Sequence, residues 1–319
     1  MQIINDTLME LIAGEATAFK NMAVSPLFSA RQSPLDYLIL EEALEQGGAV
    51  VTEVSAGGRI PELCFDNRLD SHVLLIDGDE LIGAKQNRVL NLSILVGAGH
   101  KVTIPVSCVE HGRWAYRTHR FSSARRNLYG RLKARKMASV TRAMRERNVR
   151  ASNQGEIWED IAMKFGRLHT ATETGAMGDL YDSHHGRIAG YQEAFRPLAG
   201  QVGAVFTIGG QVAGLELFDK AETLSKTLEK LVGSFALDAL EAAAERSEGR
   251  GEPGITAFLA RIKKAHVTAH PAVDLGTDLR LSGDRLVGGA LVVDGRVVHL
   301  SAFNLEEPQE QEDMEELIA

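Results

Sequence analysis

Residues 73–114 read VLLIDGDELIGAKQNRVLNLSILVGAGHKVTIPVSCVEHGRW, and this stretch decides the fold class. Four segments here alternate apolar and polar residues: 72–76, 80–84, 89–96 and 101–110. Alternation with a period of two is typical of an antiparallel sheet with one buried face. The dipeptide Asp77-Gly78 tolerates positive φ and predicts a tight hairpin between the first two segments. Pro105 has no backbone N–H, so we expect its strand at an edge or a bulge.

Helical patterns become frequent farther along the chain. Leucine and phenylalanine recur at helical spacing within residues 219–246, which predicts a long helix with one buried stripe and Asp219 as its N-cap. Residues 35–45 fit either a short helix or a strand. The remaining expected elements are helices at 132–147, 156–168, 185–195 and 255–264, a strand at 49–54, and hairpins at 204–218 and 286–303.

Chain length and these elements predict an α+β protein with two main domains. The N-terminal domain is expected to be antiparallel, β-rich and sandwich-like, and the C-terminal domain to consist of β-hairpins packed with helices. The expected divisions are a β-rich domain at 1–118, a basic, partly helical connector at 119–155, an α+β domain at 156–305 and an acidic tail at 306–319.

Two hairpin sequences resemble each other. GAVFTIGGQVAGLELF at residues 203–218 and GALVVDGRVVHLSAF at residues 289–303 share a Gly-Ala start, a glycine turn and a similar return strand. An internal repeat would place both hairpins in one sheet about a local twofold axis. The matches are few, so chance similarity stays open as the alternative.

Charge and cysteine content limit the classes of partner that the protein can have. Of the net charge of −8, most comes from residues 306–316, where seven acids are unopposed by any base, so we expect a solvated tail there. The N-terminus does not read as a signal peptide, and no apolar run reaches about 18 residues. Cys64 and Cys108 form no disulfide framework and no CxxC pair. These features indicate a reduced, cytoplasmic protein without a membrane partner.

A run of four polar side chains follows the segment that begins at Glu80. Lys85, Gln86, Asn87 and Arg88 combine cations with amides, which suits a loop that holds a phosphate or carboxylate. The alternative is a solvated connection between strands. We favour the ligand-binding interpretation because Gly83 permits close approach of the backbone and a second polar cluster follows nearby.

That second cluster is SCVEHGRW at residues 107–114. Glu110 is the candidate general base, and we take Glu80 with it as the second candidate catalytic carboxylate. Arg113 is expected to complement ligand charge and Trp114 to stack on a base. Cys108 could act as a nucleophile beside a cation, but its alternation phase places it on the apolar face, which favours a buried structural thiol.

The C-terminal half offers weaker candidates. Asp278 and Arg280 lie in a polar turn that leads into a strand, and we take them as possible ligand contacts. Two histidine pairs, at 184–185 and at 266 and 270, lack the carboxylate or helical context of a metal site, so no metal is predicted. The sequence identifies no cofactor.

The connector is strongly basic. Residues 113–150 contain thirteen Lys or Arg against the single acid Glu146. Such a cluster can bind nucleic acid through counterion release, although few aromatics accompany it and no nucleic-acid-binding motif occurs. It can also pair with acids of a neighbouring domain or of a second copy in a homo-oligomer. Nucleic-acid binding is the weaker of these hypotheses.

Several strings together resemble one family. They are ELIGAKQNRVLN, IPVSCVEHGRW, SNQGEIWEDIA, GQVAGLELFD with SFALDAL, and DLRLSGDRLVGGALVVDGRVVHLSAFN. They resemble the ARG-and-rhodanese-phosphatase-superfamily-associated protein family, where ARG stands for ADP-ribosylglycohydrolase. The resemblance implies, by association, a link to ADP-ribose or NAD-related metabolism, and it supplies no catalytic residues. We therefore expect a protein that binds an anionic, nucleotide-like ligand, with processing of that ligand as a further step. The competing hypothesis is a non-enzymatic oligomeric interaction module.

Overall fold

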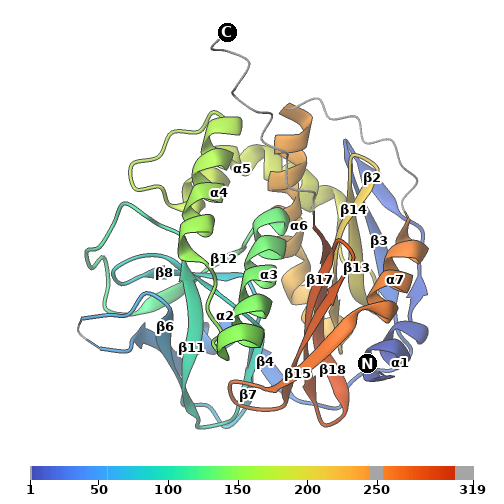
Figure 1. Cartoon of the computed structure of the whole chain (residues 1–319), viewed down its shortest axis with the longest axis horizontal. Helices are drawn as coiled ribbons and strands as arrows, with labels where there is room; N and C mark the ends of the chain where they lie inside the picture. Colours follow the sequence, from blue (N-terminus) through green and yellow to red (C-terminus); the bar gives the residue numbers. More distant parts are fainter. Residues whose placement is uncertain (1, 56, 245–253, 306–319) are drawn as a thin grey trace.

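The computed structural model describes residues 2–55, 57–244 and 254–305. Within them the chain folds into an α+β structure, as the sequence predicted, with a small β-barrel on one side and a large antiparallel sheet on the other (Figure 1). The helices pack on both faces of the sheet. The acidic tail expected at residues 306–319 lies outside the described residues.

The large sheet has nine strands in the order β1-β3-β13-β14-β18-β17-β16-β15, with β2 paired to β3. Its strands are β1 (Ile12–Ala13), β2 (Thr17–Phe19), β3 (Met22–Phe28), β13 (Gln201–Ile208), β14 (Gln211–Phe218), β15 (His266–Pro271), β16 (Thr277–Gly283), β17 (Leu286–Val293) and β18 (Arg296–Asn304). Strand β3 pairs with β13 along its whole length. The N-terminal strands therefore belong to the sheet of the C-terminal hairpins. The domain boundary at residue 118 stays a prediction.

The two similar hairpins lie next to each other in this sheet. Return strands β14 and β18 pair antiparallel, with Glu216 opposite Ser301, and β13 and β17 flank them. This is the arrangement that an internal repeat predicts for two hairpins about a local twofold axis. Their common origin stays a prediction.

The barrel closes in the order β11-β6-β5-β12-β8-β9, and a three-stranded sheet, β10-β7-β4, adjoins it. The strands are β4 (Tyr37–Ile39), β5 (Ala49–Glu53), β6 (Glu62–Asn67), β7 (His72–Leu75), β8 (Asp79–Gly83), β9 (Arg88–Leu90), β10 (Ile94–Val96), β11 (Lys101–Cys108) and β12 (Phe121–Asn127). Alternate side chains such as Leu63, Phe65, Leu81 and Ile104 fill its core. Residues 35–45, open between helix and strand, contain both β4 and a short helix.

The hairpin predicted at Asp77-Gly78 is wrong. Strand β7 pairs with β10, and β8 pairs with β9. Strands β7 and β8 therefore form one arm of a long hairpin and β9 and β10 form the other, with the tip at residues 84–87. At residues 76–79 the chain bends from the small sheet into the barrel, with Gly78 at a φ of +83°. A positive-φ dipeptide can bend a strand as well as reverse it. Pro105 stands where β11 leaves β6 and joins β9, so its missing N–H interrupts no ladder.

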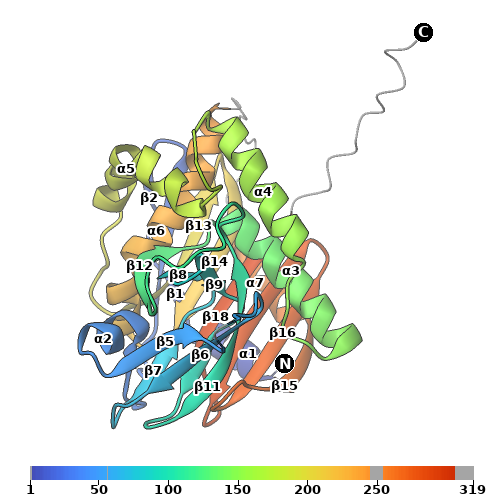
Figure 2. The same ribbon diagram turned by 90° about the vertical axis from the view of Figure 1, so that its left-hand side faces the viewer.

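Helices cover both faces of the large sheet (Figure 1), and the view from the barrel side shows α3 running in front of it (Figure 2). The helices are α1 (Gln2–Met9), α2 (Leu40–Glu45), α3 (Gly130–Arg147), α4 (Gln154–Arg167), α5 (Met177–Ala194), α6 (Ala221–Ala244) and α7 (Ile255–Lys264). Helices α3 to α6 form the main core with the sheet and the barrel, and α1 and α7 cover the opposite face. Both faces of the sheet are thus buried. Helix α5 begins eight residues before the start expected from the sequence, and none of the described helices is long and apolar enough to span a membrane.

Candidate functional site

The two polar clusters of the N-terminal half meet at one end of the barrel. The hairpin tip at residues 84–87 lies against the segment that follows β11, where Gln86 Nε2 donates to the Glu110 carbonyl oxygen at 2.9 Å. The Asn87 backbone N–H donates to Glu110 Oε2 at 3.0 Å. We call this region the barrel-end site and define it by Glu80, residues 85–88, Glu110, Arg113 and Trp114.

A buried ion pair holds the barrel-end site together. Arg113 Nε donates to Glu110 Oε1 at 2.8 Å and Nη2 donates to Oε2 at 2.6 Å. Burial alone would raise the pKa of Glu110, but hydrogen bonds from Arg113 and from the Asn87 backbone hold it below its usual range. Thr174 Oγ1 also donates to this carboxylate at 3.0 Å. Glu110 is therefore an ionised group that positions the hairpin tip.

The pKa of Glu80 is shifted in the opposite direction from that of Glu110. Burial, the dominant cause, raises its pKa to about 7, although Arg126 favours the charged form. Asn87 Nδ2 donates to Glu80 Oε1 at a long 3.5 Å, and among the described residues Glu80 Oε2 has no hydrogen-bond partner. Two nearby carboxylates whose pKa values are moved apart are the usual arrangement for acid–base chemistry. Of the two predicted carboxylates, Glu80 is the one poised to exchange a proton near neutral pH.

Cationic and aromatic side chains form the exposed rim of the barrel-end site. Lys85 Nζ lies 5.1 Å from the ring centroid of Trp114 and 5.2 Å from that of Tyr116. Trp114 is 49% exposed and Tyr116 is 44% exposed, so both rings can be reached from solvent. Arg117, also largely exposed, approaches Glu110 Oε1 at 3.8 Å. Sequence reasoning did not single out Tyr116 or Arg117, although both lie within three residues of Trp114.

Arg88 and Cys108 lie beneath this rim. Both are fully buried, and Arg88 Nη1 donates to Gln86 Oε1 at 3.1 Å. Burial raises the pKa of the Cys108 thiol despite the nearby Arg88 guanidinium. The prediction of a buried thiol is therefore confirmed. Arg88 supports the hairpin tip from inside, where a ligand at the rim would not touch it.

Asp278 and Arg280 are not brought to the barrel-end site. Both are buried on β16, where Arg280 Nε donates to Asp278 Oδ1 at 2.9 Å. Arg280 lines a small interior cavity with Asp77, Ser93 and His299. Their expected role as ligand contacts stays a prediction, and in this structure they form part of the core.

A buried chain of polar contacts joins barrel and sheet. Ser93 Oγ lies 2.7 Å from His299 Nδ1, His299 Nε2 lies 2.9 Å from Glu216 Oε2, and Lys133 Nζ donates to Glu216 Oε1 at 2.6 Å. Glu216 and His299 are both buried. Lys133 and Ser93 were missed, because their partners are at least 80 residues away along the chain.

The basic connector is mostly paired within the molecule. Its cations form ion pairs with acids of other elements, including Arg125 with Glu45, Arg126 with Asp182, Arg135 with Asp160, and Lys136 with Asp77. Helix α3 thus supplies buried cations to both the barrel and the sheet. This pairing accounts for most of the charge without an external partner.

No metal site emerges from the part of the chain that the structure describes: no three His, Cys, Asp or Glu side chains there are grouped to hold an ion. Of the two histidine pairs, His184 instead contacts Thr170 Oγ1 through Nε2 at 2.8 Å.

Comparison with known proteins finds a match to one described family. The model of the ARG and Rhodanese-Phosphatase-superfamily-associated Protein domain matches residues 10–303. No curated protein and no solved structure gives a significant match.

Proposed function

The chain belongs to this family, because the match spans most of its length, and from that premise we propose that it binds an anionic, nucleotide-like ligand at the barrel-end site. ADP-ribose or an NAD-related compound is the ligand class that the family name suggests by association. The observation that supports the site is the pair of exposed rings of Trp114 and Tyr116 beside the half-buried Lys85, above a buried, fixed polar cluster.

The rim offers both kinds of contact that a nucleotide needs. An exposed indole ring provides a stacking face for a base, worth roughly 1–3 kcal/mol. Lys85 and Arg117 provide cations for phosphate oxygens. Lys85 Nζ donates to the Gly57 carbonyl oxygen at 2.6 Å, which holds the ammonium group beside the rings. Gln86, Asn87, Arg88 and Arg113 keep the hairpin tip in place beneath.

Processing of the ligand is the second part of the proposal. Glu80, with a pKa of about 7, is present in both protonation states near neutral pH. Because Glu80 is fully buried, a proton exchange with a bound ligand requires the structure around it to open locally. Glu110 remains charged and positions this tip. The two free cysteines agree with a cytoplasmic location, which we include in the proposal.

Calorimetry with ADP-ribose, NAD and ATP tests the binding step. The wild type is expected to bind at least one of them, and Lys85→Ala and Trp114→Ala are each expected to weaken binding about tenfold or more. Lys101→Ala, which removes an exposed lysine on β11, is the matched control and should bind as the wild type does.

Two results would contradict the proposal. One is the absence of binding to all three compounds, and the other is equal binding by Lys85→Ala and the wild type. A steep salt dependence with an oligonucleotide, and none of these small ligands bound, would instead favour nucleic acid.

A further inference from the structure

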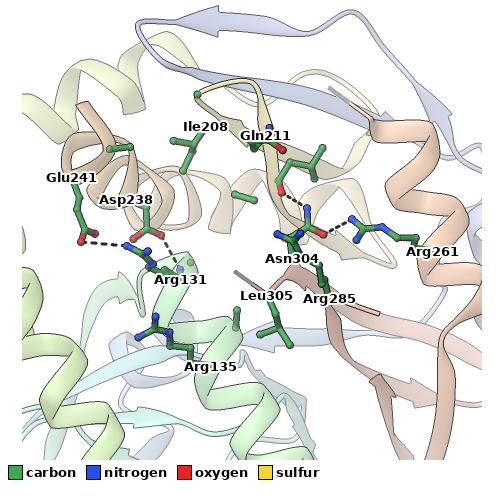
Figure 3. A pocket seen from close by; sticks show the side chains of 16 residues that line it. Arg131, Arg135, Ile208, Gln211, Asp238, Glu241, Arg261, Arg285, Asn304 and Leu305 are labelled. Carbon is green, nitrogen blue, oxygen red and sulfur yellow. Dashed lines mark hydrogen bonds and ion pairs between the residues drawn. The ribbon is translucent and has the colours of Figure 1, made fainter. Parts of the chain in front are cut away.

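A second site is suggested by the largest cavity described, which lies away from the barrel. Its volume is about 730 Å³, within the usual range for small-molecule sites. Its walls come from the start of α3, the end of α6, the β13–β14 turn, α7 and the end of β18 (Figure 3). None of the barrel-end residues lines it. We call it the arginine cavity.

Four arginines line the arginine cavity: Arg131, Arg135, Arg261 and Arg285. In Figure 3, Arg131 and Arg135 extend from α3 on one side, and Arg261 and Arg285 lie on the other. The lining carboxylates are Asp238 and Glu241. Cations thus outnumber carboxylates along the described wall.

Cations that do not line the cavity neutralise the two carboxylates. The buried Lys164 Nζ donates to Asp238 Oδ1 at 2.7 Å and also contacts Glu241. Arg167 Nη1 donates to Glu241 Oε1 at 2.8 Å. Arg131 belongs to the same paired cluster, since its Nη1 lies 3.5 Å from Glu241 Oε1.

Arg261 has no carboxylate partner among the described residues. Among the described residues its guanidinium donates to a neutral group, the Asn304 side-chain oxygen, and lies over the Phe258 ring. Asn304 is itself fixed, because its Nδ2 donates to the Val212 carbonyl oxygen. A partly exposed guanidinium held in place at a cavity wall, without a carboxylate, is suited to an anion.

Part of the remaining wall is apolar. Ile208, Val212, Ala213 and Leu305 line the same cavity. An inorganic ion would leave this surface in contact with water, whereas a ligand with an apolar body would cover it. We propose that the arginine cavity binds a small organic phosphate, with the phosphate at Arg261 and an apolar or aromatic body against Val212 and Leu305.

The test uses three probes on the full chain by calorimetry: phenyl phosphate, inorganic phosphate and phenol. Phenyl phosphate is expected to bind more tightly than either of the others, because only it offers both the anion and the ring. Arg261→Gln is expected to weaken its binding about tenfold, the usual effect of one lost charged hydrogen bond. Arg145→Gln is the matched control, since Arg145 is an exposed arginine of α3 outside the cavity.

Equal affinity of Arg261→Gln and the wild type for phenyl phosphate would overturn this proposal, as would no binding of phenyl phosphate. Lys85→Ala separates the two sites. It should leave phenyl phosphate binding unchanged, so a loss in that variant together with none in Arg261→Gln would place the probe at the barrel end. Thermal unfolding of each variant verifies that it is folded.

Discussion

At the scale of single residues, the barrel-end site contrasts two buried carboxylates. Glu110 has a guanidinium and a backbone N–H as donors, and its pKa is lowered. Glu80 has one long hydrogen bond from an amide, and burial raises its pKa to about 7. The difference arises from the partners, since both side chains are fully buried. We therefore expect substitutions at the two carboxylates and their partners to change the free energy of unfolding in different ways.

Glu80→Gln should stabilise the protein more at pH 8 than at pH 4. Between pH 4.5, the ordinary pKa of a glutamate, and about pH 7, Glu80 is protonated in the folded state and ionised in the unfolded state. The stability that Glu80 contributes is therefore complete below pH 4.5 and is lost as pH rises through 7. The variant avoids that loss, worth about 3 kcal/mol. Urea unfolding at both pH values measures it, with the exposed Glu159→Gln as control. An equal effect of Glu80→Gln at the two pH values would show that the pKa is not raised.

Arg113→Met should lower the free energy of unfolding by about 3–5 kcal/mol, because it leaves the Glu110 carboxylate buried and uncompensated. The double variant Glu110→Gln/Arg113→Met should regain part of the loss. Arg68→Met, which breaks an exposed pair with Asp66, should cost less than about 1 kcal/mol. Urea unfolding compares the three, and a cost for Arg113→Met no larger than for Arg68→Met would be inconsistent with a buried pair.

At the scale of elements, helix α3 connects the two β structures. Its sequence reads as a basic, solvated helix, yet Lys133 and Lys136 are fully buried and ion-paired with Glu216 of the sheet and Asp77 of the barrel. Burial lowers the pKa of Lys136 to about 8, although Asp77 opposes this shift. The spacing of three residues places both lysines on the same face of the helix.

Lys136→Met should destabilise the protein by about 3–5 kcal/mol, because Asp77 would lose its buried partner. Asp77→Asn in the same chain should recover part of this loss. Arg142→Met, an exposed change on the same helix, is the control. Chemical denaturation measures all three. If Lys136→Met and Arg142→Met cost the same, α3 would not be anchored through this pair.

At the scale of the whole molecule, one of the hydrophobic clusters contains residues of both the barrel side and the large sheet. Strand β3, from the N-terminus, pairs with β13, and the contact between Ser93 and His299 joins the small sheet to β18. Helices α3 and α6 pack in the same cluster as residues of both β structures. Separate unfolding of two domains would have to expose these buried charged and polar groups.

We therefore expect a single cooperative unfolding transition. The two tryptophans report on the barrel side, since Trp158 packs on His111 at 4.3 Å, whereas far-UV circular dichroism reports on the whole fold. The two signals should change at the same urea concentration. A tryptophan transition at lower urea than the dichroism transition would indicate that the barrel unfolds on its own.

The sequence by itself determined the local structure and the composition of the barrel-end site. Alternation predicted the strands at residues 72–76, 80–84 and 101–110 and the phase that buries Cys108, whereas the strand expected at 89–96 is divided into β9 and β10, and β12 and β15 were not predicted. The helices α3, α4, α6 and α7 lie within a few residues of the ranges expected from the sequence. Glu80 lies on β8, and Glu110 and Arg113 directly follow β11, which pairs with β9 of the same hairpin, so their convergence follows from short-range pairing.

Only the tertiary structure decided which strands pair and which charges are buried. Alternation shows which side of a strand is apolar, but it does not identify the neighbouring strand, so the pairing of β3 with β13 and the bend at Gly78 could not be read from the sequence. A lysine on a basic helix looks the same whether it faces water or, like Lys133, a carboxylate 83 residues away. The arginine cavity likewise exists only where segments from distant parts of the chain meet, because a cavity is a property of packing between elements.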